Sequence, residues 1–305
     1  AAKNITAITK ANPGVITSAG HGLSNGDEIF ISSVGGMTEL NTRNYRLANV
    51  TTDTFTLTDL FGAAIDTTNF TAYTSGGTAE EIFNIATPYP EAVLADLRFV
   101  QSADTMFIVH PSHEPRKLTR TDHTAWTFST ITFIDGPYLD VNTTTTTLNP
   151  NADTGTGVAL VASTNLFAAT DVGRLVSLPG GNATITAFTD AQNVTVTIND
   201  TLSATTATTN WALGAFSNTT GFPSVVTFFE QRLIFGATTN EPQSLFMSKS
   251  GDFENFTAGT ADDSAIIFQI ASNRVNSIRY LAATRVLTIG TSGGEYVLST
   301  TNDGP

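Results

Sequence analysis

Short runs of alternating apolar and polar residues recur along this chain, and glycine, asparagine or proline separates them. Examples are the run EIFI at 28–31, which follows Asn25-Gly26, and the run TFTLT at 54–58. A period of two residues is typical of half-buried strands, and runs of this length match strands rather than helices. Threonine, which favours strands because it is β-branched, fills 54 of the 305 positions. We therefore predict an all-β fold.

The charge balance and the absence of cysteine exclude several classes of function. The chain has 27 acidic and 14 basic residues, a net charge of −13. Such a surface does not grip nucleic acid, because phosphate binding depends on Lys and Arg. Without cysteine there are no disulfides, thiolate nucleophiles or Cys-ligated zinc sites. No apolar run approaches the length of about 18 residues that spans a bilayer. Because the start has no initiator methionine or signal-like segment and the last residues resemble a loop cut short, we expect a piece of a longer polypeptide.

Residues 1–80 are predicted to form one small β-barrel module. The segment contains HGLSNGD at 21–27, GMTELN at 36–41 and NFTAYTSGG at 69–77. In these motifs it resembles the first catalytic cysteine half-domain of ubiquitin-activating enzymes. The resemblance implies a β-barrel insertion that does not carry the reactive thiol of those enzymes. Since this chain has no cysteine, only the fold carries over, and thioester chemistry is excluded.

Three later segments repeat one order of elements: strand, turn, strand, loop, strand. In the first two, a loop proline stands three residues before a leucine, as Pro115 does before Leu118 and Pro242 before Leu245. Units of three or four short strands that bury their faces only against neighbours are typical of β-propeller blades. Residues 81–136 and 221–305 are therefore predicted to form a partial set of propeller-like blades.

Residues 137–220 interrupt these blade segments. A run of five threonines follows Asn142 and is predicted to be a solvated connector. Alternating runs bounded by turns come after it, at 158–162, 174–178, 183–187 and 193–198. This pattern predicts a second inserted module, similar to a β-sandwich.

Two groups of residues resemble reactive sites but fit them poorly. His110 and His113 are three residues apart in a proline-flanked hairpin, whereas the helical zinc motif needs ligands at i and i+4. Asp252 and Glu254 alternate as a pair of glycosidase acids would, yet Phe253 between them favours a polar blade edge. We expect no catalysis, no metal and no cofactor. Four basic residues are predicted to contact a neighbouring subunit or a phosphate: Arg116, Lys117, Arg120 and Arg279.

The blade segments carry a second resemblance. The stretches DLRFVQSADTMFIVHP, FFEQRLIF and SKSGDFENF resemble bacteriophage tail nozzle, or tail tubular, proteins. This implies a non-enzymatic structural component of a virion tail, whose copies form a ring, expected to be a hexamer, in contact with the portal adaptor and other tail proteins. DNA would be ejected through the lumen without specific binding, and an acidic lumen would let the duplex slide.

Two alternatives remain open. The first is a carbohydrate-binding or adhesin-like virion surface protein, with residues 137–220 as the glycan reader. Only two tryptophans, Trp126 and Trp211, are available as stacking platforms, which counts against it. The second is a polysaccharide depolymerase that uses Asp252 and Glu254.

Overall fold

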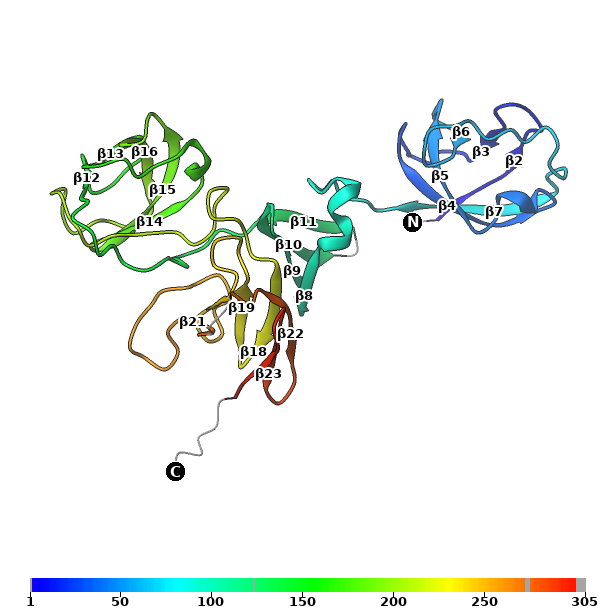
Figure 1. Ribbon diagram of the computed structural model, residues 1–305. Helices are drawn as coiled ribbons and strands as arrows, with labels where there is room; N and C mark the ends of the chain where they lie inside the picture. The colour runs from blue at the N-terminus through cyan, green and yellow to red at the C-terminus, as the bar shows by residue number, and fades with distance from the viewer. Residues whose placement is uncertain (1, 123, 272–274, 300–305) are drawn as a thin grey trace. The chain divides into compact units, whose positions relative to one another are not determined.

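The protein is all-β and divides into two compact units, residues 1–86 and 87–305 (Figure 1). The computed structural model describes residues 2–122, 124–271 and 275–299. Within these ranges the helical structure consists of three short 3₁₀ turns: η1 (Thr38–Leu40), η2 (Glu91–Asp96) and η3 (Ala169–Asp171).

The first unit is one curled sheet with the strand order β1-β7-β4-β5-β6-β3-β2. Its strands are β1 (Lys3–Asn4), β2 (Ala7–Ile8), β3 (Val15–Thr17), β4 (Glu28–Gly35), β5 (Arg43–Ala48), β6 (Thr54–Thr58) and β7 (Ser75–Ile82). In the first half of β4 every second residue faces the interior, where Ile29 and Ile31 are fully buried with Phe55. The period-two pattern of the sequence thus places one side of the sheet in the core.

Two consecutive residues join the edges of this sheet. The backbone N–H of Ile5 donates to the carbonyl of Gly77 in β7, and the N–H of Thr6 donates to the carbonyl of Thr17 in β3. Because β7 and β3 stand at opposite sides of the strand order, the sheet has to curl until these sides nearly meet. This curling hides backbone groups that a flat sheet would leave open at its edges.

The second unit contains three antiparallel meanders. The first meander comprises β8 (Arg98–Ser102), β9 (Thr105–His110), β10 (His113–Asp122) and β11 (Ala125–Thr130). The second comprises β18 (Val225–Phe229), β19 (Arg232–Gly236), β20 (Ser244–Met247) and β21 (Ile266–Gln269). The third comprises β22 (Ile278–Ala283), β23 (Leu287–Thr291) and β24 (Glu295–Leu298).

Strands β18–β20 of the second meander are covered on both faces. Phe235 and Phe246 point to the side of Phe107 in the first meander, and together they form one core cluster. Their neighbours Ile234 and Leu245 point the other way and pack with Ile289 of the third meander in another cluster. Residues next to each other on a strand face opposite sides, so burial on both sides requires the continuous apolar runs of β18–β20.

The remaining strands form one six-stranded sheet, in the order β12-β13-β16-β15-β14-β17. They are β12 (Leu148–Pro150), β13 (Val158–Ala162), β14 (Leu175–Leu178), β15 (Gly181–Phe188), β16 (Asn193–Ile198) and β17 (Ala212–Leu213). Their inward side chains share a core with Trp211, whose indole N–H donates to the carbonyl of Thr146 at 2.9 Å.

One local prediction is wrong. Pro115 was expected in a loop but lies inside β10, at a register shift between His113 and Arg116 where the strand tolerates a missing N–H. In the threonine run at 143–147 the first three residues are exposed, as a solvated connector requires, and the amide of Asn142 donates to the carbonyls of Thr144 and Thr146.

Candidate functional site

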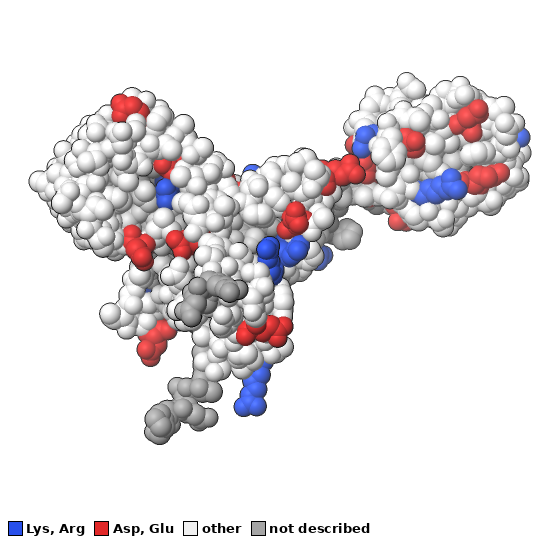
Figure 2. Space-filling model, viewed as in Figure 1, with Lys and Arg blue, Asp and Glu red and all other residues white. Residues whose placement is uncertain are grey.

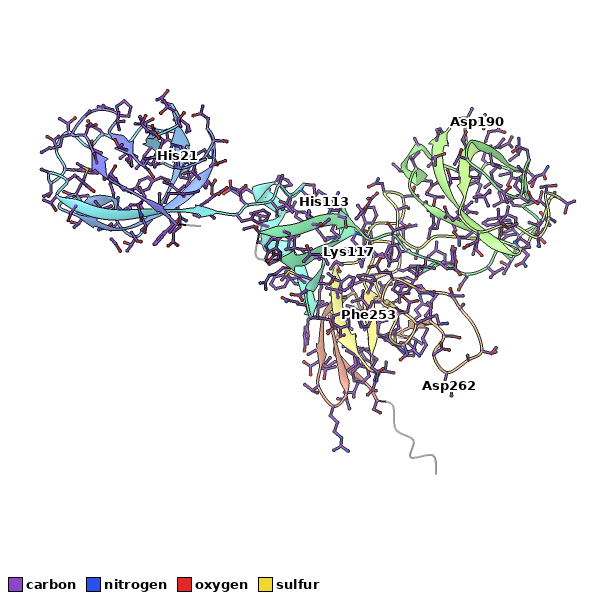
Figure 3. The ribbon with its side chains drawn as sticks, turned by 180° about the vertical axis from the view of Figure 1, so that it is seen from behind. His21, His113, Lys117, Asp190, Phe253 and Asp262 are labelled. Carbon is purple, nitrogen blue, oxygen red and sulfur yellow. The ribbon has the colours of Figure 1, made fainter. Side chains whose placement is uncertain are left out.

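The four predicted basic residues do not share one face. Arg116 and Arg120 project from the outer face of the first meander, where their guanidinium groups lie 5.4 Å from the Phe128 ring centroid and 5.7 Å from that of Trp126. Lys117 faces the opposite side of the same strand, as its pairing with Phe107 shows; Figure 3 labels it in the first meander, near Phe253. Arg279 lies in β22, in another sheet. The structure therefore brings together only Arg116 and Arg120.

Lys117 is engaged in an ion pair that links two meanders. Its Nζ donates to Oε1 of Glu254 at 2.5 Å, across 137 positions of sequence. Next to it, Oδ2 of Asp252 accepts from the amide of Asn255 at 2.9 Å. Phe253 and the buried Phe256 belong to the core between the two meanders. Both carboxylates of the considered depolymerase pair thus have structural partners.

The histidines of the first meander have local partners as well. Nδ1 of the buried His110 accepts from the backbone N–H of Ser112 at 3.1 Å. Burial lowers the pKa of His110, and the neighbouring His113 lowers it further. Among the residues that the structure describes, no three His, Asp or Glu side chains gather in a way that could hold a metal ion.

The motifs of the first unit stabilise its loops. In HGLSNGD, Nδ1 of the buried His21 accepts from the N–H of Leu23, and Oδ2 of Asp27 accepts from the N–H of Ser24. In GMTELN, Glu39 accepts two hydrogen bonds from Thr71, which lower the pKa of Glu39. These residues act on the backbone of the module itself.

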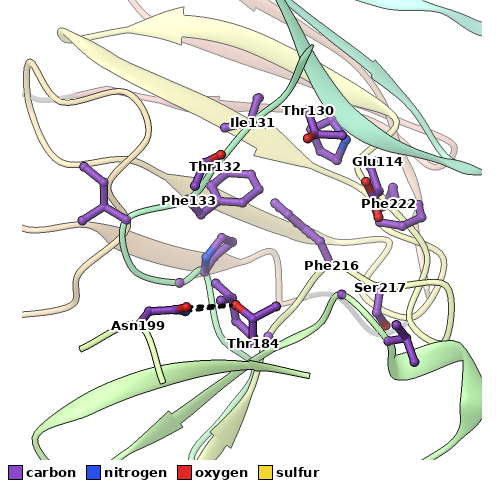
Figure 4. A pocket seen from close by; sticks show the side chains of 18 of the residues that line it. Glu114, Thr130, Ile131, Thr132, Phe133, Thr184, Asn199, Phe216, Ser217 and Phe222 are labelled. Atoms are coloured by element: carbon purple, nitrogen blue, oxygen red, sulfur yellow. Dashed lines mark hydrogen bonds between the residues drawn. The ribbon is translucent and has the colours of Figure 1, made fainter. Parts of the chain in front are cut away.

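A cavity of about 480 Å³ lies in the second unit, between the first meander and the six-stranded sheet (Figure 4). The segment 130–137 forms one wall, the loop 172–175 and the residues Thr184, Asn199 and Asp200 form another, and the segment 214–222 closes it. Rings of Phe133 and Phe216 meet on its apolar side, with centroids 5.7 Å apart. The carboxylate of Glu114 enters from β10.

Buried polar groups hold the polar wall of this cavity in place. Asn182 is 2% exposed; its amide N donates to Oδ2 of Asp200 at 2.8 Å, and its amide O accepts from Asn199 at 2.7 Å. Behind it, Tyr138 donates to Asp135 at 2.5 Å, and burial together with this hydrogen bond raises the pKa of Tyr138. The wall is thus fixed by side chains that do not themselves open into the cavity.

A buried ion pair joins two further parts of the cavity lining. Arg174 donates to Oδ1 of Asp171 at 2.8 Å and, through Nε, to the carbonyl of Gly214 at 2.8 Å. Burial lowers the pKa of Arg174, while Asp171 acts in the opposite direction. This pair ties the loop at 172–175 to the segment that begins at Gly214.

Exposed apolar residues gather at the edge strand of the second meander. Ile266, Ile267 and Phe268 of β21 are 44%, 52% and 40% exposed. Among the strands that the structure describes, β21 pairs only with β20, and just before it Ala265 forms a bridge with Ala258. Three consecutive exposed apolar side chains project from both faces of this edge, which is where another chain can add a strand.

The visible surface is largely uncharged, with scattered acidic and basic groups (Figure 2). Figure 2 shows no broad basic patch on the face that it presents. Within the described ranges, no helix is long and apolar enough to cross a membrane.

Comparison with known families identifies the first module. Residues 11–82 match the model of the ubiquitin-activating enzyme E1 FCCH domain, in agreement with the motifs at 21–27, 36–41 and 69–77. The match spans about a quarter of the chain. No curated protein matches the chain.

The assignment to the tail nozzle proteins is wrong. The family that matches is the FCCH domain of ubiquitin-activating enzymes, and no phage tail family matches any part of the chain. The stretches that suggested the assignment are strands and tight turns of the first two meanders. Apolar strands that end in Gly or Pro turns recur in many unrelated antiparallel sheets, so this pattern does not identify a family.

Proposed function

We propose that this protein is a non-catalytic structural subunit that assembles with further copies of itself. One observation supports this most directly: the edge strand β21 exposes Ile266, Ile267 and Phe268 and carries no charge. Edge strands of stable monomers are usually protected by charged residues, proline or a covering segment. An apolar, uncharged edge is suited to pairing with another chain.

The two outer faces of the stacked meanders support the same role. Phe99 on the outer face of the first meander is 64% exposed, and Val297 on that of the third is 64% exposed. The first face carries Arg116 and Arg120, and the other carries Glu295. Different, complementary surfaces on one chain favour head-to-tail contacts, which close into rings when the rotation allows it.

The finer part of the proposal concerns where such a ring would work. We propose a virion tail component, with six copies as the expected order and DNA passing through the lumen. This part of the proposal is supported by the net charge of −13, which disfavours tight binding to a duplex, and it does not use any family assignment.

The assembly is tested by mass photometry of the chain over a range of concentrations, with the variant Ile267→Lys. We expect oligomers of the unaltered chain and a monomer for Ile267→Lys, because a lysine on an edge strand blocks strand addition. Val161→Lys is the matched control, since Val161 is 41% exposed in β13 of a different sheet. If the unaltered chain stays monomeric throughout, or if both variants behave alike, the proposal fails.

A further inference from the structure

We propose that the cavity between the first meander and the six-stranded sheet binds a neutral saccharide of one or two rings. This goes beyond the structural role and does not depend on it. The cavity of about 480 Å³ falls within the range of about 300–1,000 Å³ that is usual for small-molecule sites.

The apolar side of the cavity offers flat rings. Phe133, Phe216 and Phe222 line it, and the first two are only half-buried (Figure 4). Their centroids lie 5.7 Å apart with the planes inclined by 60°. A sugar ring has an apolar face of C–H groups, and aromatic rings of this kind can pack against that face.

The polar sides of the cavity offer both donors and acceptors. The side chains with neutral polar groups are Thr130, Thr132, Thr184, Asn199 and Asn218, whereas the hydroxyl of the buried Ser217 is already bonded to Thr219 and Thr220. Each sugar hydroxyl donates one hydrogen bond and accepts others, as the hydroxyls and amides of these residues do. The carboxylates of Glu114 and Asp200 add acceptors at two separate walls. A polyhydroxylated ligand therefore satisfies this lining better than an apolar one.

The acidic residues that line the cavity disfavour the binding of anionic ligands. Glu114 and Asp200 are acidic, and no Lys or Arg is among the lining residues that the structure describes. Arg174 stands between the lining residues Gly173 and Leu175, but it is buried in its ion pair with Asp171. A ligand that carries phosphate or carboxylate would be repelled. An alkylammonium ligand would use the carboxylates and the rings but would make no use of the amide and hydroxyl groups of the lining.

The polar wall is organised before any ligand arrives. The buried Asn182 orients both Asn199 and Asp200 through its two amide atoms. Binding sites need such supporting contacts, because a side chain already held in position loses little conformational freedom when a ligand binds. Glu114 and the segment 130–133 lie outside residues 137–220, so this site needs the first meander as well as the six-stranded sheet. It differs in this respect from a glycan reader made of residues 137–220 alone.

The test is saturation-transfer NMR on the full chain with glucose, galactose, mannose, N-acetylglucosamine, maltose and lactose, alongside choline and inorganic phosphate as charged probes. We expect transfer to at least one sugar, with a Kd of about 1 mM or below. Val172→Trp should abolish it, because Val172 lines the cavity and is 42% exposed. Val161→Trp, at a valine of 41% exposure in β13 and outside the cavity lining, should leave the signal unchanged. Asn199→Ala should weaken binding by about tenfold, the loss of the hydrogen bond that Oδ1 of Asn199 can accept, since its amide N already donates to Asn182 and Thr184.

Three outcomes would overturn the proposal: no sugar gives a signal, the two tryptophan variants bind equally, or choline or phosphate binds while no sugar does. The assembly proposal is tested separately in the same samples. Ile267→Lys should keep full sugar binding even where it abolishes oligomers, so that a failure of one proposal leaves the other intact.

Discussion

Asn41 holds one residue of a neighbouring strand with both ends of its amide. Its Oδ1 accepts from the N–H of Val34 at 2.8 Å, and its Nδ2 donates to the carbonyl of Val34 at 3.0 Å. Next to Val34, Ser33 has a φ of 60°, a left-handed conformation that is uncommon for a residue with a side chain. The amide therefore satisfies the backbone where the pairing of β4 is irregular.

The variant Asn41→Ala should destabilise the first unit by about 1–3 kcal/mol, because it leaves two partly buried backbone groups of Val34 without partners. Calorimetry of the full chain should show one transition moved to lower temperature and a second one unchanged, since residues 1–86 and 87–305 are separate compact units. Asn44→Ala is the control: Asn44 is exposed on β5 and should change nothing. A shift of both transitions, or of neither, would contradict this reading.

Single residues were predictable where their role is local. The motifs around His21, Asp27 and Glu39 could be recognised from sequence, and the structure explains them as loop-stabilising groups. The pair Lys117–Glu254 spans 137 positions, and no local pattern indicates that these two side chains meet. Asn182 stood in a stretch that predicts a turn, and its role as the support of a cavity wall depends on strands folded around it.

The second meander is central to the aromatic packing of the second unit. Phe235 is fully buried, and its ring contacts those of Phe133, Phe216 and Phe256 at centroid distances of 6.1, 5.8 and 5.9 Å. These rings come from three segments of the chain, two of which also line the cavity. Packing in the meander and the shape of the cavity are therefore coupled.

Phe235→Ala should lower the free energy of unfolding of the second unit by about 3–5 kcal/mol, through lost burial and the cavity that remains. Urea denaturation followed by the fluorescence of Trp126 and Trp211, both in this unit, measures it. Phe99→Ala serves as the matched control, because Phe99 is 64% exposed and its loss should cost no more than about 0.5 kcal/mol. Equal effects of the two variants would show that the ring cluster does not stabilise the unit.

At the scale of elements, the period-two pattern predicted the strands well. The all-β fold is confirmed, since the alternation of apolar and threonine-rich positions has a direct counterpart in faces that are buried and exposed. Burial of the second meander on both sides could be expected from the uninterrupted apolar run LIF at 233–235. The run IIF at 266–268 in β21 is equally apolar but exposed, so the sequence alone does not reveal which of these two runs is buried.

For the whole molecule, the net charge of −13 leads to a prediction about nucleic acid. The chain should leave the fluorescence anisotropy of a short labelled duplex unchanged at about 0.15 M salt, whereas non-specific DNA-binding proteins bind with a Kd of about 10⁻⁴–10⁻⁶ M. A salt-sensitive rise in anisotropy that disappears in Arg116→Gln or Arg120→Gln would contradict a lumen through which DNA slides freely.

The first and last strands of the first unit, β1 and β7, lie next to each other in its sheet. Lys3 of β1 pairs with Ala79 of β7, only three residues before β7 ends at Ile82. A folded body whose entrance and exit are neighbours can be placed in a surface loop of another protein without stretching the host chain, since the host only has to bridge a short gap. Such a domain can be inserted into different proteins during evolution. Residues 11–82 match the model of the FCCH domain of ubiquitin-activating enzymes, and this geometry is suited to one module that occurs in different proteins.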